Sequence, residues 1–428
     1  MVNGQTPNQT IAAERVFSTP ATGQFFGGYY DKSIFSANDQ FILCHKAQNP
    51  ERMPRSGESV EIGFFDWMQS DTFQPISKSY SWNWQQGTQL QWLSGTSRFI
   101  FNDLRDGRFR AVISSIEGQE EAVLDSPIYE ISPDGSTGLT IDYERHFWLR
   151  KGYHYEGVEN AAKSTPYDPE DGIWTVDLGS GRARRIIRLG DVAELEWTPS
   201  MEGGSQYLEH MMFSPCGEKF CFLHRWRLKD GGIYSRLLTA EANGSNMRIV
   251  ADSGRMSHFS WLGPSKIIAF GGVQKPWSSL RRGGGLRSRL FRLALPIYRK
   301  VVPVNSALRS QLTGDTYMIL DTEGGAPYEL RAEYLTRDGH PTCSPLDPNL
   351  VVSDTYEDLG GHRTLMLFEP GAPQPLWVDQ IPSCPDTDDT SMRADLHPKW
   401  SRSSRFFSVD TSRACNRALE VFRVQGLY

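Results

Sequence analysis

One short pattern recurs seven times along the chain: an apolar or aromatic residue, a serine, a turn, and then a strand of alternating apolar residues. Its copies are Phe35-Ser36, Leu93-Ser94, Ile131-Ser132, Phe213-Ser214, Phe259-Ser260, Cys343-Ser344 and Trp400-Ser401. Each copy is followed by a further hairpin or strand, so that a repeat supplies up to four strands. Seven four-stranded units close into a ring without leaving a long edge strand. The repeat therefore predicts an all-β fold, a single seven-bladed β-propeller over residues 1–428.

The last repeat has only one strand after its inner hairpin, the segment ALEVFRV. A four-stranded blade needs one more strand, and the other end of the chain can supply it. We therefore expect residues from about 15 to 26 to complete the last blade. Two β-sandwiches are the alternative for a chain of this length, but they would not repeat one motif seven times in register.

The charge balance and the cysteines exclude several classes of protein. The formal net charge is −6, whereas nucleic-acid-binding proteins usually carry a basic balance, so we expect no nucleic-acid partner. The six cysteines show no CxxC spacing, which argues against a zinc ribbon or a redox dithiol, and we expect most of them to be small core residues. The N-terminus lacks a signal-peptide pattern and no apolar run is long enough to span a membrane. These features predict a cytoplasmic protein.

Four of the nine histidines precede the repeated motif by one or three positions, in four consecutive repeats. They are His210, His258, His340 and His397. Because the innermost strand of each blade starts at the mouth of the central channel, we expect the ring to bring these imidazoles together. Convergent imidazoles are a donor set that divalent Mn, Fe, Ni or Zn prefers. The alternative is that each histidine forms hydrogen bonds only within its own blade.

The second strand of each inner hairpin returns to the same mouth, so the residues at its end are expected to surround the histidines. These candidates are His45, Asn102, Asp103, Tyr143, Arg225, Asp354, Tyr356, Asp410 and Arg413. Forked guanidinium donors beside aromatic rings suit a polyhydroxylated ligand with carboxylates, which means an acidic sugar. The alternative for the aspartates is that they accept hydrogen bonds from turn amides.

The segment WNWQQG precedes the inner strand of the second repeat and is also expected to reach the mouth. Its residues Trp82, Trp84 and Gln86 are candidates for stacking on a sugar and hydrogen-bonding it. The alternative is that the tryptophans pack against neighbouring blades, because tryptophan is usually largely buried.

Several stretches resemble the TolB-like propellers of the oligogalacturonate lyase family. They are GYYDKSIFSANDQFILCHK, EHMMFSPCGEKFCFLHRW, SHFSW, DGHP and DLHPKWS, and the resemblance extends from about Gly27 onward. The family cleaves uronic-acid glycosides by β-elimination, with manganese held by histidines and a glutamine and another histidine as base. The resemblance implies that His210 is the base and that His258 and His397 bind the metal. The family's glutamine has no counterpart in residues 392–397, so His340 is expected to complete the ligand set.

The residues at the mouth fit that chemistry. Removing the proton beside a uronate carboxylate requires the carboxylate charge to be neutralised, which a metal together with Arg225 or Arg413 can do. Tyr143 or Tyr356 would then protonate the leaving oxygen. The residues therefore predict a metal-dependent, carbohydrate-active enzyme, a lyase that acts on an acidic saccharide, and the resemblance implies Mn as the ion. A hydrolase that uses two of Asp103, Asp354 and Asp410 is an alternative.

A basic segment interrupts the fifth repeat at about residues 273–312. No acidic residue occurs between Asp252 and Asp315, while basic residues accumulate, including Arg281, Arg282, Arg287, Arg289, Arg292, Arg299 and Lys300. The stretch LRSRLFRLALPIYRKVV has apolar residues at helical spacing, which predicts an amphipathic helix on an anionic membrane. A solvated loop or a helix packed on the propeller is the alternative. The membrane hypothesis gives a second candidate function, a non-catalytic or glycan-processing propeller docked on the inner membrane in surface-polysaccharide biosynthesis.

Overall fold

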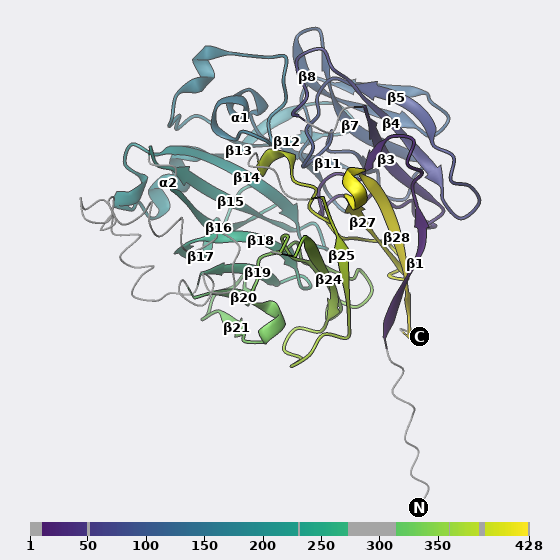
Figure 1. Ribbon diagram of the computed structural model, residues 1–428. Helices are drawn as coiled ribbons and strands as arrows, with labels where there is room; N and C mark the ends of the chain where they lie inside the picture. The colour runs from purple at the N-terminus through teal and green to yellow at the C-terminus, as the bar shows by residue number, and fades with distance from the viewer. Residues whose placement is uncertain are drawn as a thin grey trace, which may run out of the picture.

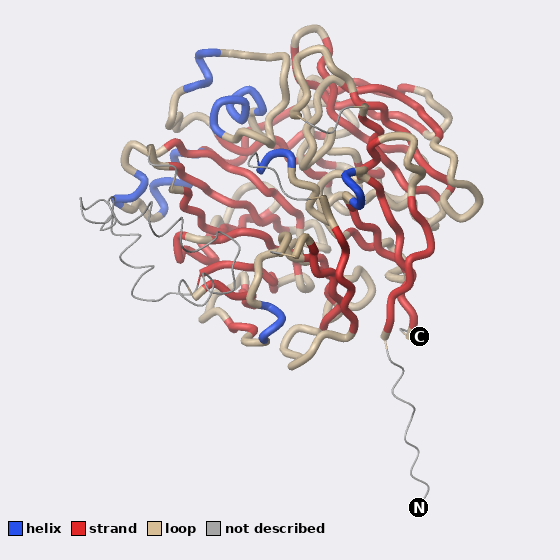
Figure 2. Tube along the Cα trace, viewed as in Figure 1, coloured by secondary structure: helices blue, strands red, loops and turns tan. Residues whose placement is uncertain are grey.

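The computed structural model describes residues 11–48, 52–229, 232–272, 314–358, 360–384 and 390–426. In these residues the strands form seven four-stranded antiparallel sheets, arranged as the blades of a ring (Figure 1). Helices are confined to short segments that connect the strands (Figure 2). The predicted all-β, seven-bladed propeller is therefore confirmed.

The first four blades contain the following strands, each blade running outward from the channel. They are β2 (Gln24–Phe26), β3 (Phe41–Ala47), β4 (Val60–Asp66) and β5 (Gln74–Ser79); β6 (Gln91–Trp92), β7 (Arg98–Arg105), β8 (Arg108–Ser115) and β9 (Glu120–Leu124); β10 (Glu130–Ile131), β11 (Thr137–Thr140), β12 (Gly172–Asp177) and β13 (Ala183–Arg188); and β14 (Ser205–Phe213), β15 (Lys219–Arg227), β16 (Ile233–Glu241) and β17 (Arg248–Gly254).

The last three blades follow the same order. They contain β18 (Met256–Trp261), β19 (Lys266–Gly272), β20 (Asp315–Asp321) and β21 (Tyr328–Leu330); β22 (Thr342–Cys343), β23 (Val351–Asp354), β24 (His362–Phe368) and β25 (Trp377–Pro382); and β26 (Lys399–Trp400), β27 (Phe406–Thr411), β28 (Ala418–Gln425) and β1 (Ala12–Ser18). The helical segments are α1 (Tyr143–Leu149), α2 (Leu189–Leu195), and the single turns η1 (Ala161–Ser164), η2 (Pro199–Met201), η4 (Glu333–Leu335), η5 (Thr390–Met392) and η6 (Arg413–Cys415).

The repeated serine closes the turn between the innermost strand and the second strand of a blade. In four blades its hydroxyl accepts a hydrogen bond from an amide five residues later, and its own amide donates to the carbonyl of that same residue. The pairs are Ser36 with Phe41, Ser132 with Thr137, Ser214 with Lys219, and Ser401 with Phe406, with N···Oγ distances of 2.9 to 3.2 Å. A side chain that satisfies the turn amide fixes the register of the hairpin, which explains why the motif keeps serine.

The N-terminal strand β1 closes the ring. It pairs antiparallel with β28, from Ala12 opposite Gln425 to Ser18 opposite Glu420. The predicted closing range of 15–26 spans two strands with different partners, because β2 pairs with β3 as the innermost strand of the first blade. Between β1 and β2 the chain therefore passes from the outermost position of the last blade to the innermost position of the first.

The segment 27–33, which follows β2, reaches across to blades on the far side of the ring. Tyr30 donates a hydrogen bond to the carbonyl of Phe259 on β18 at 3.0 Å. Lys32 forms a buried ion pair with Glu130 on β10 at 2.5 Å. This segment thus connects the first blade with the third and fifth blades, and it places two tyrosines beside the channel axis.

The basic insertion predicted at 273–312, with the residues from Arg281 to Lys300, lies outside the described residues. Within the described ranges, no helix is long and apolar enough to cross a membrane.

Two cysteines that the sequence pattern did not pair form a disulfide. Cys384 lies after β25 and Cys415 in η6, with their Cα atoms 4.8 Å apart. Of the other cysteines, Cys44 and Cys221 are buried, as expected for core residues, whereas Cys216 is exposed. Disulfides are typical of oxidising compartments and are rare in the cytosol.

Replacing both bridged cysteines with serine is expected to lower the free energy of unfolding by roughly 2–4 kcal/mol, because the bridge restricts the unfolded chain. Urea unfolding of the Cys384→Ser/Cys415→Ser variant measures this change, and adding reductant to the unmodified protein should reproduce it. Cys216→Ser is the matched control, with an expected change of less than about 0.5 kcal/mol. Equal stability of the unmodified protein with and without reductant would contradict the bridge.

Candidate functional site

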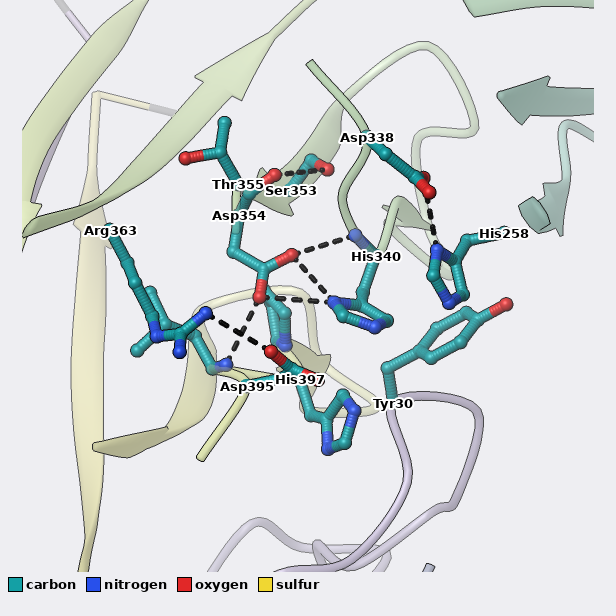
Figure 3. A network of polar contacts seen from close by, with 12 residues as sticks. Tyr30, His258, Asp338, His340, Ser353, Asp354, Thr355, Arg363, Asp395 and His397 are labelled. Atoms are coloured by element: carbon teal, nitrogen blue, oxygen red, sulfur yellow. Dashed lines mark hydrogen bonds and ion pairs between the residues drawn. The ribbon is translucent and has the colours of Figure 1, made fainter. Parts of the chain in front are cut away.

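The four histidines converge at the channel mouth. The ring centroids of His258 and His340 are 4.1 Å apart, those of His340 and His397 are 4.5 Å apart, and those of His210 and His258 are 6.0 Å apart. All four side chains are buried. Figure 3 shows the rings of His258, His340 and His397 turned toward one space beside Tyr30. The structure thus brings together the residues that the repeat placed at equivalent positions.

The backbone is irregular where it presents these histidines. His210 and His258 each lie in a one-residue bulge, since the register shifts between Glu209 and Met212 on β14 and between Met256 and Phe259 on β18. His210 and His397 also have positive φ, of 53° and 44°, in the left-handed region that side chains other than glycine seldom adopt. Bulges and left-handed residues of this kind redirect side chains and gather at functional sites.

Two carboxylates orient two of the rings. Asp354 accepts a hydrogen bond from Nδ1 of His340 at 2.8 Å, and Asp338 lies 3.0 Å from Nδ1 of His258 (Figure 3). With Nδ1 engaged in both cases, Nε2 is the ring nitrogen left for a ligand. A carboxylate behind a histidine is the usual arrangement that fixes the tautomer of a metal-binding imidazole.

Asp395 joins the histidines as a further donor. One ligand atom from each of His340, Asp395 and His397 lies within 4.8 Å of the others. Nε2 of His397 is buried without a hydrogen-bond partner, and Oδ2 of Asp395 accepts no hydrogen bond but lies 3.4 Å from a terminal nitrogen of Arg393. Imidazole nitrogens together with one carboxylate are a donor set for Mn, Fe or Zn, so these residues fit a divalent ion. Sequence reasoning had proposed His258, His340 and His397 as ligands and had not included Asp395.

Charged neighbours set the protonation of this cluster. Burial alone would raise the pKa of Asp395, but the Arg393 and Arg363 guanidinium groups lower it to about 2. Burial lowers the pKa of His210 and His397 well below the ordinary imidazole value. Both imidazoles are therefore neutral at neutral pH, each with a lone pair that can accept a proton or bind a metal.

Three arginines lie at the edge of the cluster. Arg225 and Arg150 form ion pairs with the two oxygens of buried Glu209, at 2.6 Å and 2.7 Å. On the other side, the Arg393 guanidinium stacks on the ring of Tyr356 at 4.3 Å. The Tyr356 ring in turn lies 5.8 Å from that of His340 and 6.1 Å from that of His258. Arg225 and Tyr356, both predicted site residues, therefore lie beside the histidines.

His210 has its own set of partners. Its Nε2 lies 2.5 Å from the Tyr29 hydroxyl, and its backbone amide donates to the Tyr129 hydroxyl at 3.1 Å. Its Nδ1 is buried without a hydrogen-bond partner. The Tyr29 ring also lies 5.0 Å from that of His397, so this tyrosine connects the two histidines that have left-handed backbones.

Two predicted catalytic residues lie elsewhere. Tyr143 is buried in α1, where its ring stacks on that of Tyr155 with the centroids 4.7 Å apart and lies 6.5 Å from that of Tyr129. Arg413 pairs with Glu420 at 2.8 Å and lines a surface depression between the last two blades. Both follow a strand end, as the sequence argument required, but their contacts are with residues other than the four histidines.

Seven predicted substrate-binding residues are buried and hydrogen-bonded to the protein itself. His45 stacks on Phe26, and the others bond as follows: Trp82 to Glu58 O, Trp84 to Arg52 O, Gln86 to the Tyr129 hydroxyl, Asn102 to Ile128 O, Asp103 to the Tyr80 amide, and Asp410 to the Gly27 amide and Lys399. They connect neighbouring segments of the ring. With Asp354 committed to His340, the three aspartates proposed for hydrolysis all have structural partners.

Sequence reasoning missed several residues of the site. Tyr29 and Tyr30 lie in the GYYDK stretch that carried the family resemblance, and this stretch could have indicated them as site residues. Asp395 stands two residues before His397 and could have been found by that spacing. Arg150 and Arg393 come from loops outside the repeat, and the spacing of the repeat does not predict where these loops place their side chains.

Comparison with known proteins places the fold. The sequence matches no family model and no curated protein sequence. An oligogalacturonate lyase solved in complex with manganese superposes with a TM-score of 0.59 at 14 % identity, over 96 % of this chain and 93 % of that chain. The likeness shows the fold. An oligogalacturonate lyase from Vibrio parahaemolyticus superposes with a TM-score of 0.58 at 12 % identity, over 97 % of both chains. TolB from Acinetobacter baumannii is more distant, with a TM-score of 0.38.

A pH experiment tests the structural role of His45. Burial lowers the pKa of His45 from 6.5 to about 3, so the unfolded chain binds the proton more readily and His45 contributes stability above pH 6.5 that is lost as the pH falls. Between pH 7.5 and pH 5 this loss amounts to about 2 kcal/mol. The stability difference between the unmodified protein and His45→Gln should shrink by that amount, as measured by urea unfolding.

Gln69→Ala, at an exposed position without a titratable group, is the matched control and should keep the pH dependence of the unmodified protein. Identical pH slopes for the unmodified protein and His45→Gln would show that His45 is not held neutral in the folded state.

Proposed function

We propose that the chain is a metal-dependent enzyme that cleaves a uronate-containing saccharide by β-elimination, a polysaccharide or oligosaccharide lyase. The observation that carries this proposal is the convergence of four buried histidines and Asp395 beside the Arg225–Glu209 ion pair. The fold shared with oligogalacturonate lyases supports the proposal at the level of architecture, and one of those lyases was solved with manganese.

His340, Asp395 and His397 would hold the ion, with His258 beside them, and manganese is the ion we propose. A divalent ion at this position supplies a Lewis acid that stabilises negative charge on a substrate carboxylate. Asp338 and Asp354 orient two of the imidazoles from behind, which is the arrangement expected of a built metal site rather than of isolated core histidines.

Three residues of the chain bind the substrate carboxylate and transfer the two protons. Arg225, held by Glu209, binds the uronate carboxylate and neutralises it as the adjacent carbon loses its proton. His210 accepts that proton, and the carbon–oxygen bond to the leaving sugar breaks as a carbon–carbon double bond forms. Tyr356 donates its proton to the leaving oxygen, which leaves Tyr143 without a role in the reaction.

The membrane-docking alternative depends on residues 281–300, which lie outside the described residues. A hydrolytic mechanism would need two available carboxylates, and Asp103, Asp354 and Asp410 are each engaged by the protein. The elimination mechanism gives a role to more of the residues at the site than a hydrolytic mechanism does.

Metal content is the first test. Elemental mass spectrometry of the purified protein, loaded with Mn²⁺ and desalted, should find near-stoichiometric manganese, and the His340→Ala/His397→Ala variant should lose it. His362→Ala, at a partly exposed position on β24, is the matched control and should keep the metal. Absence of bound metal from the unmodified protein, or its retention in the double variant, would refute the site.

Turnover tests the base. On oligogalacturonate, the unmodified protein should produce an unsaturated uronate, which is detected by the ultraviolet absorbance of its double bond. His210→Gln should reduce the rate by about 10²- to 10⁴-fold, the usual contribution of a general base, while metal content stays unchanged. A variant with unaltered turnover would remove His210 from the mechanism, and release of saturated sugars would show hydrolysis.

A further inference from the structure

Two guanidinium groups share a single buried carboxylate at the edge of the histidine cluster. Arg150 pairs through Nε with one oxygen of Glu209 at 2.7 Å, and Arg225 pairs through Nε with the other oxygen at 2.6 Å. The Glu209 side chain is 1 % exposed, whereas those of Arg150 and Arg225 are 14 % and 11 % exposed. Two positive charges and one negative charge leave this group with a formal charge of +1.

The pairing leaves donors available. Each arginine engages Glu209 through Nε, and the two terminal nitrogens of a guanidinium are the pair that binds a carboxylate in a forked geometry. Among the described residues, neither Arg150 nor Arg225 has a second carboxylate within ion-pair distance. Arg150 and Arg225 together carry one more charge than Glu209 neutralises, and an excess of positive charge on half-buried side chains favours an anionic ligand.

Arg150 faces the same space as the proposed base. Its guanidinium stacks on the ring of Tyr153 at 3.9 Å, and that ring lies 6.3 Å from the ring of His210. Glu209 is bonded directly to His210 along β14, so both arginines are tied to the residue that precedes the base. The loop after α1 thus contributes a cation to this site.

We propose that Arg150 is a substrate-binding and specificity-determining residue that, together with Arg225, holds the carboxylate of the sugar at the reaction centre and selects the free acid over its ester. This inference rests on the proposed function and extends it to a residue outside the repeat. Glu209 acts as a positioning residue, because it fixes the spacing of the two guanidinium groups. A methyl ester removes the charge and one acceptor, so it cannot engage both arginines.

The test measures binding of trigalacturonate and of its methyl ester by isothermal titration calorimetry, in the His210→Gln protein so that turnover does not consume the ligand. Adding Arg150→Met should weaken binding of the acid by about 10- to 100-fold, the effect of losing a charge-assisted pair of hydrogen bonds, and leave binding of the ester unchanged. Arg150→Lys keeps the ion pair with Glu209 but lacks the fork, and it should give an intermediate loss. Arg105→Met, which removes an arginine paired with Asp103 and Glu120 in the second blade, is the control and should change neither affinity.

Unchanged affinity for the acid in both Arg150 variants would overturn the inference and leave the lyase proposal standing. An equal loss for acid and ester would also overturn it, because Arg150 would then only support the fold of the mouth. Failure of the protein with Arg150 intact to bind either saccharide would overturn the inference together with the proposed substrate class.

Discussion

Withdrawing four neighbouring imidazole rings from water is the physical constraint on which the site depends. Each buried ring nitrogen needs a partner, and the structure supplies Asp338 and Asp354 for two of the rings and the Tyr29 hydroxyl for a third. Nδ1 of His210 and Nε2 of His397 have no hydrogen-bond partner, and Nε2 of His397 lies beside His340 and Asp395, where a divalent ion would find its donors. The site therefore combines ring nitrogens that have hydrogen-bond partners in the protein with ring nitrogens that have none and can bind a ligand.

The propeller makes this arrangement possible because its innermost strands all begin at one mouth. A regular strand would place alternate side chains against neighbouring blades, and the bulges at His210 and His258 release two rings toward the axis instead. The segment 27–33 then places Tyr29 and Tyr30 beside the histidines, where their rings contact those of His397 and His340. The candidate donors His340, Asp395 and His397 lie just before the innermost strands β22 and β26, and the loop after α1 adds the positive charge of Arg150.

The sequence predicted the fold and the histidine cluster for one reason, which is that both follow from the repeat. Equivalent positions in equivalent blades must converge, so His210, His258, His340 and His397 could be placed without a structure. The same argument failed at the returning strands, where His45, Asn102 and Asp103 connect neighbouring segments rather than face the channel. Arg150 and Arg393 could not be predicted, because they come from loops whose length and direction no period fixes.

Closure by β1 has a consequence for how the protein is made. β1 is synthesised before every other described strand and β28 after all of them, yet the two must pair to complete the last blade. A contact between such distant parts of the chain forms late in folding, because the entropy of closing the intervening loop must be overcome first. Asp395 and His397 lie just before β26, the innermost strand of that same blade. The arrangement that brings these two side chains beside His340 is therefore complete only when β1 and β28 pair, after the last blade has been synthesised.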